Sequence, residues 1–234
     1  MVQSTLSHAA TDALVPALAP LVILALLGTA FLLVCAVIGA GVAAAARRLG
    51  LAKGLGGAGL AVTVIYATLL VAVSLFSRER TLAPGERKYF CEIDCHLAYD
   101  VTTAAAPDPA TRVVSVRTWF DPSTIASFRG NGPLSPNPRT VWLVDDAGRR
   151  YAPSESATHE WEKAHGNSTP LDRQLRPGES YTTTFVFKLP PEARAPRFFL
   201  GDPPGPENLL IGHENGPLHG KIYFALATPQ AAAL

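Results

Sequence analysis

The sequence predicts a two-helix transmembrane hairpin that carries an all-β domain, folded as an antiparallel sandwich of about seven to eight strands. Two observations predict the hairpin: residues 21–46 and 55–77 contain no Asp, Glu, Lys or Arg, and each segment can cross about 30 Å of hydrocarbon as a helix. The sandwich is predicted because short strand patterns separated by Pro and Gly fill the rest of the chain. The expected parts are an N-terminal segment (1–20), the hairpin (21–77), the β domain (81–228) and a tail (229–234).

A basic link joins the two apolar segments. Residues 47–54 include Arg47, Arg48 and Lys53, whereas no Lys or Arg precedes the first segment. Membrane helices tend to leave Lys and Arg in the cytoplasm, so we expect a cytoplasmic link, with both termini and the β domain outside. Residues 1–20 lack the basic start of a signal peptide, which predicts an uncleaved anchor. The Ala-, Pro- and Arg-rich composition adds the expectation of a bacterial inner membrane and a periplasmic β domain.

Small residues gather at the linked ends of both apolar segments. The first segment finishes with a stretch at 39–46 that is Gly and Ala except for Val42, and the second begins with the Gly-rich run 54–59. In an antiparallel pair these runs face each other, and small residues let membrane helices approach closely. We therefore expect tight packing at the linked end and bulkier outer halves that face lipid or another subunit.

The β domain is predicted from alternation with a period of two. In residues 89–101 the odd positions are Tyr, Cys, Ile, Cys, Leu, Tyr and Val, and the even positions include Glu, Asp and His. This pattern predicts one unbroken strand with a buried and a solvated face. Residues 159–165 are predicted as a short helix and 130–139 as a long loop. The other predicted strands are residues 112–120, 140–145, 180–189, 197–200, 209–213 and 218–227.

Residues 175–190 carry a recognisable pattern, in which Leu-Arg-Pro-Gly-Glu is followed by Phe-Val-Phe-Lys-Leu-Pro. The segment resembles the "L-x-P-G-E … F-x-F-x-L-P" strand of immunoglobulin-like domains in uncharacterised bacterial membrane-anchored proteins. The Pro-Gly turn and the alternation after it account for the pattern physically. The resemblance implies an extracytoplasmic immunoglobulin-like sandwich, and it carries no catalytic residue.

Cys91 and Cys95 form a Cys-x-x-x-Cys motif. A helical hairpin followed by an outer β domain with this spacing looks like subunit II of haem–copper oxidases, which implies a copper centre. The chain departs from that family because the pair opens the domain and Met1 is the only methionine. On an unbroken strand, residues four apart lie about 13 Å from each other, which is too far for a disulfide. We therefore expect buried free thiols, with a redox pair or metal site as the alternative.

A second group of possible ligands surrounds a Gly-Pro turn. His213, Glu214 and His219 could form a zinc or copper site with His96, since imidazole and carboxylate suit these metals. The alternative is a polar turn whose side chains hydrogen-bond the backbone. We favour that alternative, so neither a metal nor a cofactor is expected.

The sequence shows no catalytic constellation, and its net charge of +1 does not favour nucleic acid as a partner. We expect no enzyme activity and no small-molecule substrate. The favoured function is a structural or interaction subunit that sits in the lipid bilayer and docks onto other membrane protein subunits. Respiratory and photosynthetic complexes are the first hosts to test. The alternatives are an extracytoplasmic copper, zinc or electron-transfer protein and, third, a ligand-sensing module.

Overall fold

The computed structural model describes residues 3–90, 96–125 and 129–226, with side chains from Pro20 onward. The chain divides into two compact units. The first unit contains the two N-terminal helices together with Pro204–Gly220, and the second contains Glu79–Pro203 with the segment that follows from Lys221. The segment 204–220, predicted as part of the β domain, therefore clusters with the helices.

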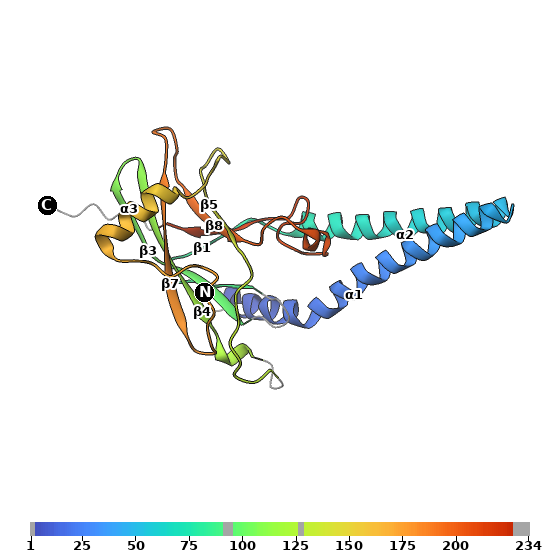
Figure 1. Cartoon of the computed structure of the whole chain (residues 1–234), viewed down its shortest axis with the longest axis horizontal. Coiled ribbons are helices and arrows are strands. Elements are labelled where there is room, and N and C mark those ends of the chain that lie inside the picture. Colours follow the sequence, from blue (N-terminus) through green and yellow to red (C-terminus); the bar gives the residue numbers. More distant parts are fainter. Residues whose placement is uncertain (1–2, 91–95, 126–128, 227–234) are drawn as a thin grey trace. The chain divides into compact units, whose positions relative to one another are not determined.

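Two long helices form most of the first unit (Figure 1). Helix α1 spans Gln3–Ala45 and helix α2 spans Leu49–Phe76. Their segments Pro20–Ala45 and Leu49–Phe76 are both long and apolar enough to cross a membrane. The turn between them is shorter than predicted, because α2 takes up most of the basic link. Arg47 closes this turn with a positive φ of 58°.

The second unit contains two β-sheets among its described residues (Figure 1). The strands are β1 (Arg80–Leu82), β2 (Lys88–Phe90), β3 (Leu97–Asp108), β4 (Thr111–Phe120), β5 (Thr140–Val144), β6 (Arg150–Tyr151), β7 (Ser180–Lys188), β8 (Arg197–Gly201) and β9 (Ile222–Ala225). One sheet has the order β1-β9-β8-β5-β6 and the other the order β2-β3-β4-β7. Strands β1 and β9 run parallel, so the five-stranded sheet is mixed instead of antiparallel throughout.

One hydrophobic core joins the two sheets. Phe198 on β8 is fully buried, and its ring centroid lies 6.2 Å from that of Phe187 on β7 and 6.1 Å from that of Phe224 on β9. Tyr99 on β3 and Leu143 on β5 belong to the same buried cluster. Because this cluster draws on both sheets, the sheets pack face to face as a sandwich.

The prediction of a single strand over residues 89–101 is wrong. Strands β2 and β3 are antiparallel partners, and Phe90 pairs with Leu97, so the chain reverses its direction between these two residues. No Gly or Pro marks the reversal in the sequence. Cys91 and Cys95 lie outside the described residues. The argument that placed them about 13 Å apart on one strand no longer applies.

The other predicted elements differ in how closely they match the structure. Strands β4, β5, β7 and β8 lie where they were predicted, each bound within one residue. Helix α3 (Glu155–His165) begins earlier than predicted, because the Ser154 hydroxyl caps it by accepting from the Ala157 amide at 3.3 Å. The strand predicted at 209–213 is absent, and a short 3-10 helix, η2 (Pro206–Leu209), with successive turns replaces it. A second 3-10 helix, η1 (Pro122–Thr124), follows β4.

Candidate functional site

The contact between α1 and α2 is made by small residues, as the sequence predicted. A Cβ atom added at Gly39 would lie 3.1 Å from Leu55 Cδ1, and one added at Gly59 would lie 3.2 Å from Ala36 Cβ. Ala43, close to the turn, is buried. Both glycines therefore lie at a tight contact with the other helix, where a larger side chain requires the neighbouring side chain or the helix to shift.

Most of the remaining surface of the helix pair is apolar and exposed. Phe31 on α1 is 67% exposed and Phe76 on α2 is 87% exposed. No charged residue occurs in 20–45 or in 54–76. Soluble proteins rarely leave contiguous apolar surface of this extent in water. The helix pair therefore needs lipid or another protein to cover it.

Pro204–Gly220, which we call the docked segment, lies beside the C-terminal part of α2 (Figure 1). The Tyr66 hydroxyl donates to the Leu209 carbonyl at 2.8 Å. The Ser77 hydroxyl accepts from the Gly220 amide at 2.6 Å. Two hydrogen bonds therefore hold the segment against α2, more than 140 residues away in the sequence.

The predicted metal ligands are distributed over both units. His96 belongs to the second unit, where it is buried, and its ring stacks on Phe120 with centroids 4.7 Å apart. Cys91 and Cys95 are outside the described residues. Cys35, on α1, is exposed.

His213, Glu214 and His219 lie in the docked segment of the first unit. His213 Nδ1 accepts from the Asn215 amide at 3.1 Å, and His219 Nδ1 lies 2.8 Å from the Gly220 carbonyl, to which it donates. Over the described parts of the chain, no group of three or more His, Cys, Asp or Glu side chains could hold a metal ion. Both imidazoles thus engage the backbone, in the manner of a polar turn.

The second unit contains two buried cations that sequence reasoning missed. The Lys88 ammonium donates to the Leu200 carbonyl at 2.7 Å and lies 5.1 Å from the ring centroid of Phe90. The Arg139 guanidinium lies 4.0 Å from the centroid of the same ring and forms an ion pair with Asp202. Buried charges persist when they are paired and hydrogen-bonded. No local sequence pattern predicts this cluster, because its members are far apart in the sequence.

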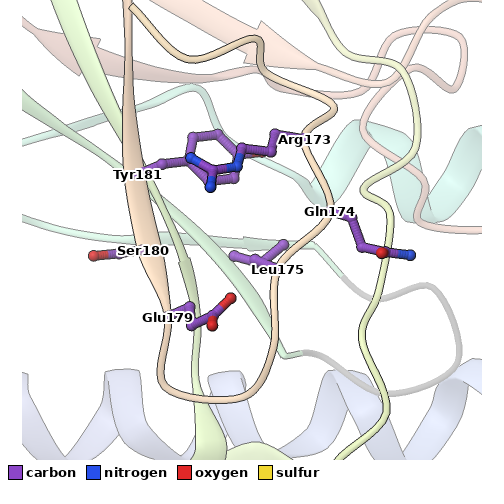
Figure 2. A pocket seen from close by; sticks show the side chains of 6 residues that line it. All are labelled: Arg173, Gln174, Leu175, Glu179, Ser180 and Tyr181. Atoms are coloured by element: carbon purple, nitrogen blue, oxygen red, sulfur yellow. The ribbon is translucent and has the colours of Figure 1, made fainter.

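A hollow of about 240 Å³ lies at the start of β7 (Figure 2). The Tyr181 hydroxyl donates to the Leu171 carbonyl at 2.6 Å, and the Glu179 carboxylate accepts from the Arg176 amide at 2.8 Å. Burial raises the pKa of Tyr181 to about 12, so the phenol stays protonated at neutral pH. The hollow is smaller than the roughly 300–1,000 Å³ typical of small-molecule sites. Its lining residues are Arg173, Gln174, Leu175, Glu179, Ser180 and Tyr181.

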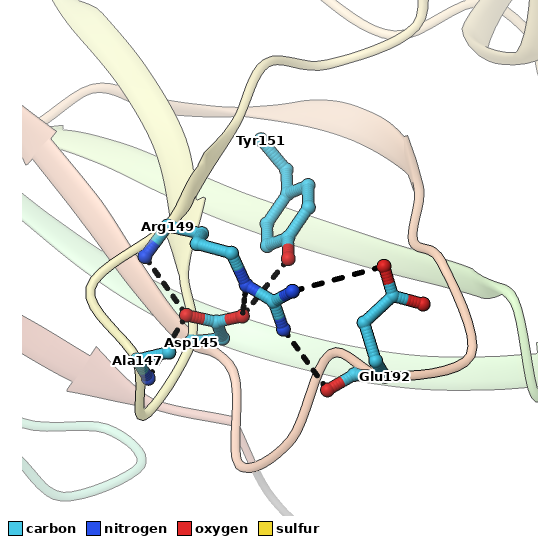
Figure 3. Close-up of polar contacts among 5 residues, drawn as sticks. All are labelled: Asp145, Ala147, Arg149, Tyr151 and Glu192. Atoms are coloured by element: carbon cyan, nitrogen blue, oxygen red, sulfur yellow. Dashed lines mark hydrogen bonds and ion pairs between the residues drawn. The ribbon is translucent and has the colours of Figure 1, made fainter.

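Asp145 is the centre of a polar cluster that closes the turn between β5 and β6 (Figure 3). Its carboxylate accepts from the amides of Ala147 and Arg149 at 3.0 and 2.8 Å, from Arg149 Nε at 2.7 Å and from the Tyr151 hydroxyl at 2.9 Å. Arg149 also donates to the Glu192 carbonyl at 3.0 Å. Burial alone would raise the pKa of Asp145, but these hydrogen bonds lower it below its ordinary value. A carboxylate held in its charged form stabilises the turn and is poorly suited to donating a proton near neutral pH.

No protein-family model and no curated protein matches the chain. Solved structures that resemble part of it include the yjhA protein from Bacillus subtilis, with 12% identity and a TM-score of 0.38 over 62% of this chain and 99% of that one. A conserved hypothetical protein from Bacillus anthracis has 15% identity and a TM-score of 0.35 over 53% and 92%. The secreted protein MPT63 from Mycobacterium tuberculosis has 10% identity and a TM-score of 0.38 over 63% and 97%. Likenesses at these scores assign neither a family nor a function.

Proposed function

We propose that the protein is a non-catalytic, membrane-anchored subunit that docks onto a larger membrane protein complex. The helix pair is the observation that carries this proposal. Gly39 and Gly59 lie where the two helices contact each other, and large side chains such as Phe31 and Phe76 stay exposed on the helix pair. A bilayer covers such a surface, and a neighbouring subunit covers the part of it that takes part in docking.

The orientation of the helix pair in the membrane follows from the distribution of Lys and Arg along the chain. Arg47, Arg48 and Lys53 lie at the turn between the helices, and the positive-inside rule places this turn in the cytoplasm. The β domain then faces the periplasm of a bacterial cell. Its two sheets around one core are compatible with the immunoglobulin-like sandwich of uncharacterised bacterial membrane-anchored proteins.

The polar groups of the β domain support a role in contact and not in catalysis. The phenol at the hollow of Figure 2 and the carboxylate of Figure 3 are engaged in internal hydrogen bonds. Docking onto other subunits is the function that fits such a domain on a membrane anchor.

Purification from native membranes in a mild detergent tests the proposal. We expect the full chain to stay in the membrane fraction after a carbonate wash and to co-purify with other membrane proteins in a fixed ratio. Cells that express the chain without an affinity tag provide the control for unspecific capture. A chain released by carbonate would overturn the anchor. A lone monomer without co-purifying proteins would overturn the role as a subunit.

A further inference from the structure

The docked segment inverts the usual distribution of polar and apolar residues. Its ionisable side chains, those of Glu207, His213, Glu214 and His219, are all partly buried. Leu209, in contrast, is 52% exposed and Leu218 is 70% exposed. Every exposed residue of the segment is Pro, Gly or Leu, namely Pro204, Pro206, Leu209, Gly212, Pro217 and Leu218. Charged side chains are normally the exposed ones in a loop that faces water, so this segment is suited to apolar surroundings.

The backbone of the segment satisfies its own hydrogen bonds. Five amides each donate to the carbonyl three residues earlier, at distances of 2.8 to 3.3 Å; they belong to Asn208, Leu210, His213, Gly216 and His219. Lipid-exposed irregular backbone does not occur within the hydrocarbon core, and at the edge of the core its N–H and C=O groups still need hydrogen-bond partners. Successive turns meet much of that requirement here.

The segment follows one face of α2 over several turns. The Tyr66 and Ser77 hydroxyls hydrogen-bond to it, and between them Leu70 and Ser74 are buried. A Cβ atom added at Gly216 would lie 3.6 Å from Ser74 Oγ. Positions 66, 70, 74 and 77 recur at the spacing of a single helix face. The two hydrogen-bonded side chains are separated by about 17 Å along the helix axis.

In a hairpin that spans a membrane, this stretch of α2 would fall near the outer boundary of the bilayer. The uncharged part of α2 and its cap, Gly54–Ser77, extends for about 36 Å, which exceeds a hydrocarbon thickness of about 30 Å. Hydrocarbon that starts directly after Lys53 ends near Val73, so Tyr66 lies inside it. Hydrocarbon that starts at the beginning of α2 ends about two residues beyond Tyr66. In both registers the Tyr66 end of the segment meets α2 inside the hydrocarbon, whereas the Ser77 end lies about 6 Å beyond the hydrocarbon in the first register and about 13 Å beyond it in the second.

We propose that the docked segment is a membrane-embedded loop. It lies in the outer interface of the bilayer beside α2, with Leu209 and Leu218 in contact with phospholipid acyl chains. Its carboxylates and imidazoles are drawn in, away from the lipid. The inference rests on the proposed membrane anchor, and it gives the chain a second attachment to lipid besides the two helices.

Spin-label accessibility in proteoliposomes of phosphatidylcholine and phosphatidylglycerol tests this loop. A nitroxide is attached to a ketone amino acid introduced at position 209 or 218, so the native cysteines remain unchanged. Position 32 on α1 is the control for the anchor, and exposed position 163 on α3 is the control for water. We expect the ratio of oxygen to nickel-chelate accessibility at 209 and 218 to exceed the ratio at 163 and to approach the ratio at 32.

The outcomes separate the loop from the anchor. A water-like ratio at 209 and 218 together with a lipid-like ratio at 32 overturns the membrane-embedded loop and leaves the anchor in place. A water-like ratio at 32 overturns the anchor itself. Unchanged tryptophan fluorescence shows that each labelled chain is folded, and the two loop positions give independent readings should one of them fail to fold.

Discussion

Removing two phenylalanine rings tests whether the two sheets share one core. Phe198 on β8 and Phe187 on β7 are both fully buried, and their rings meet edge to face at 6.2 Å and 75°. Replacing either buried ring by alanine costs about 3–5 kcal/mol of unfolding free energy, because it removes apolar contacts and leaves a cavity. The ring pair itself contributes roughly 0.5–1.5 kcal/mol. Each single variant already removes the whole interaction between the two rings, so the sum of the single variants counts this interaction twice, whereas the double variant loses it once. It should therefore be less destabilised than the sum of the single variants by about this coupling energy.

Val144 provides the matched control on the same sheet. It lies on β5 and packs with Phe199 and Tyr223 in a cluster separate from the shared core. Phe198 and Val144 are therefore on opposite faces of the five-stranded sheet. Phe198→Ala combined with Val144→Ala should therefore show a weaker coupling than the Phe187 and Phe198 pair, because the two side chains pack in separate clusters.

Urea unfolding of the full chain in dodecyl maltoside measures these energies. Tryptophan fluorescence reports on the β domain, and far-UV circular dichroism shows whether the transition is cooperative. A coupling between Phe187 and Phe198 no larger than that of the control pair would show that β7 and β8 do not face each other. The assignment of a single core between two sheets would then be refuted.

Gly59→Leu should weaken the helix pair by about 1–3 kcal/mol in a dodecyl sulfate titration, because its Cβ would lie 3.2 Å from Ala36 Cβ. The matched variant Gly56→Leu, with nothing within 4 Å of the added atom, should retain stability, and equal losses would contradict the contact. Asp145→Asn should flatten acid unfolding. The lowered pKa of Asp145 stabilises the fold above the ordinary value of 3.8, and this stabilisation is lost as the pH falls through the lowered value. Urea midpoints measured from pH 7 down to about pH 2 test this, and parallel profiles of variant and parent below the ordinary value of 3.8 would contradict it. Elemental analysis of the full chain should find no stoichiometric copper or zinc, and a stoichiometric metal would favour the metal-binding alternative.

The features that could be predicted from the sequence are those decided locally. Length and the absence of charge predict the two apolar helices, because a membrane span must satisfy both conditions within one segment. Alternation predicts β4 and β7, because these strands have one face toward a core, and short continuous apolar runs predict β5 and β8. The start of α2 was missed, since the glycines and basic residues of 49–54 do not prevent a helix.

The hairpin of β2 and β3 shows where local reading fails. Phe90 of β2 and its partner Leu97 of β3 both belong to the shared core, so the core-facing positions change from even to odd residue numbers at the turn. A lysine at a buried position argues against a core strand when the sequence is read alone. It is tolerated here because its ammonium donates to the Leu200 carbonyl, 112 residues away. The buried lysine of β2 can therefore be explained only when its distant partner, the Leu200 carbonyl, is known.

The docked segment illustrates a different ambiguity. The run Leu209–Leu210–Ile211 reads as a buried strand because apolarity alone does not say whether a side chain faces a protein core or lipid. A signal that distinguishes the two was present, since Pro204, Pro206 and Pro217 cannot take part in the ladder of a central strand. An apolar run flanked by prolines, in a chain that already contains two long apolar helices, therefore favours a loop whose leucines face outward. Within the run that misled the strand prediction, Leu209 is the exposed residue, and it is one of the two leucines that we propose to contact lipid.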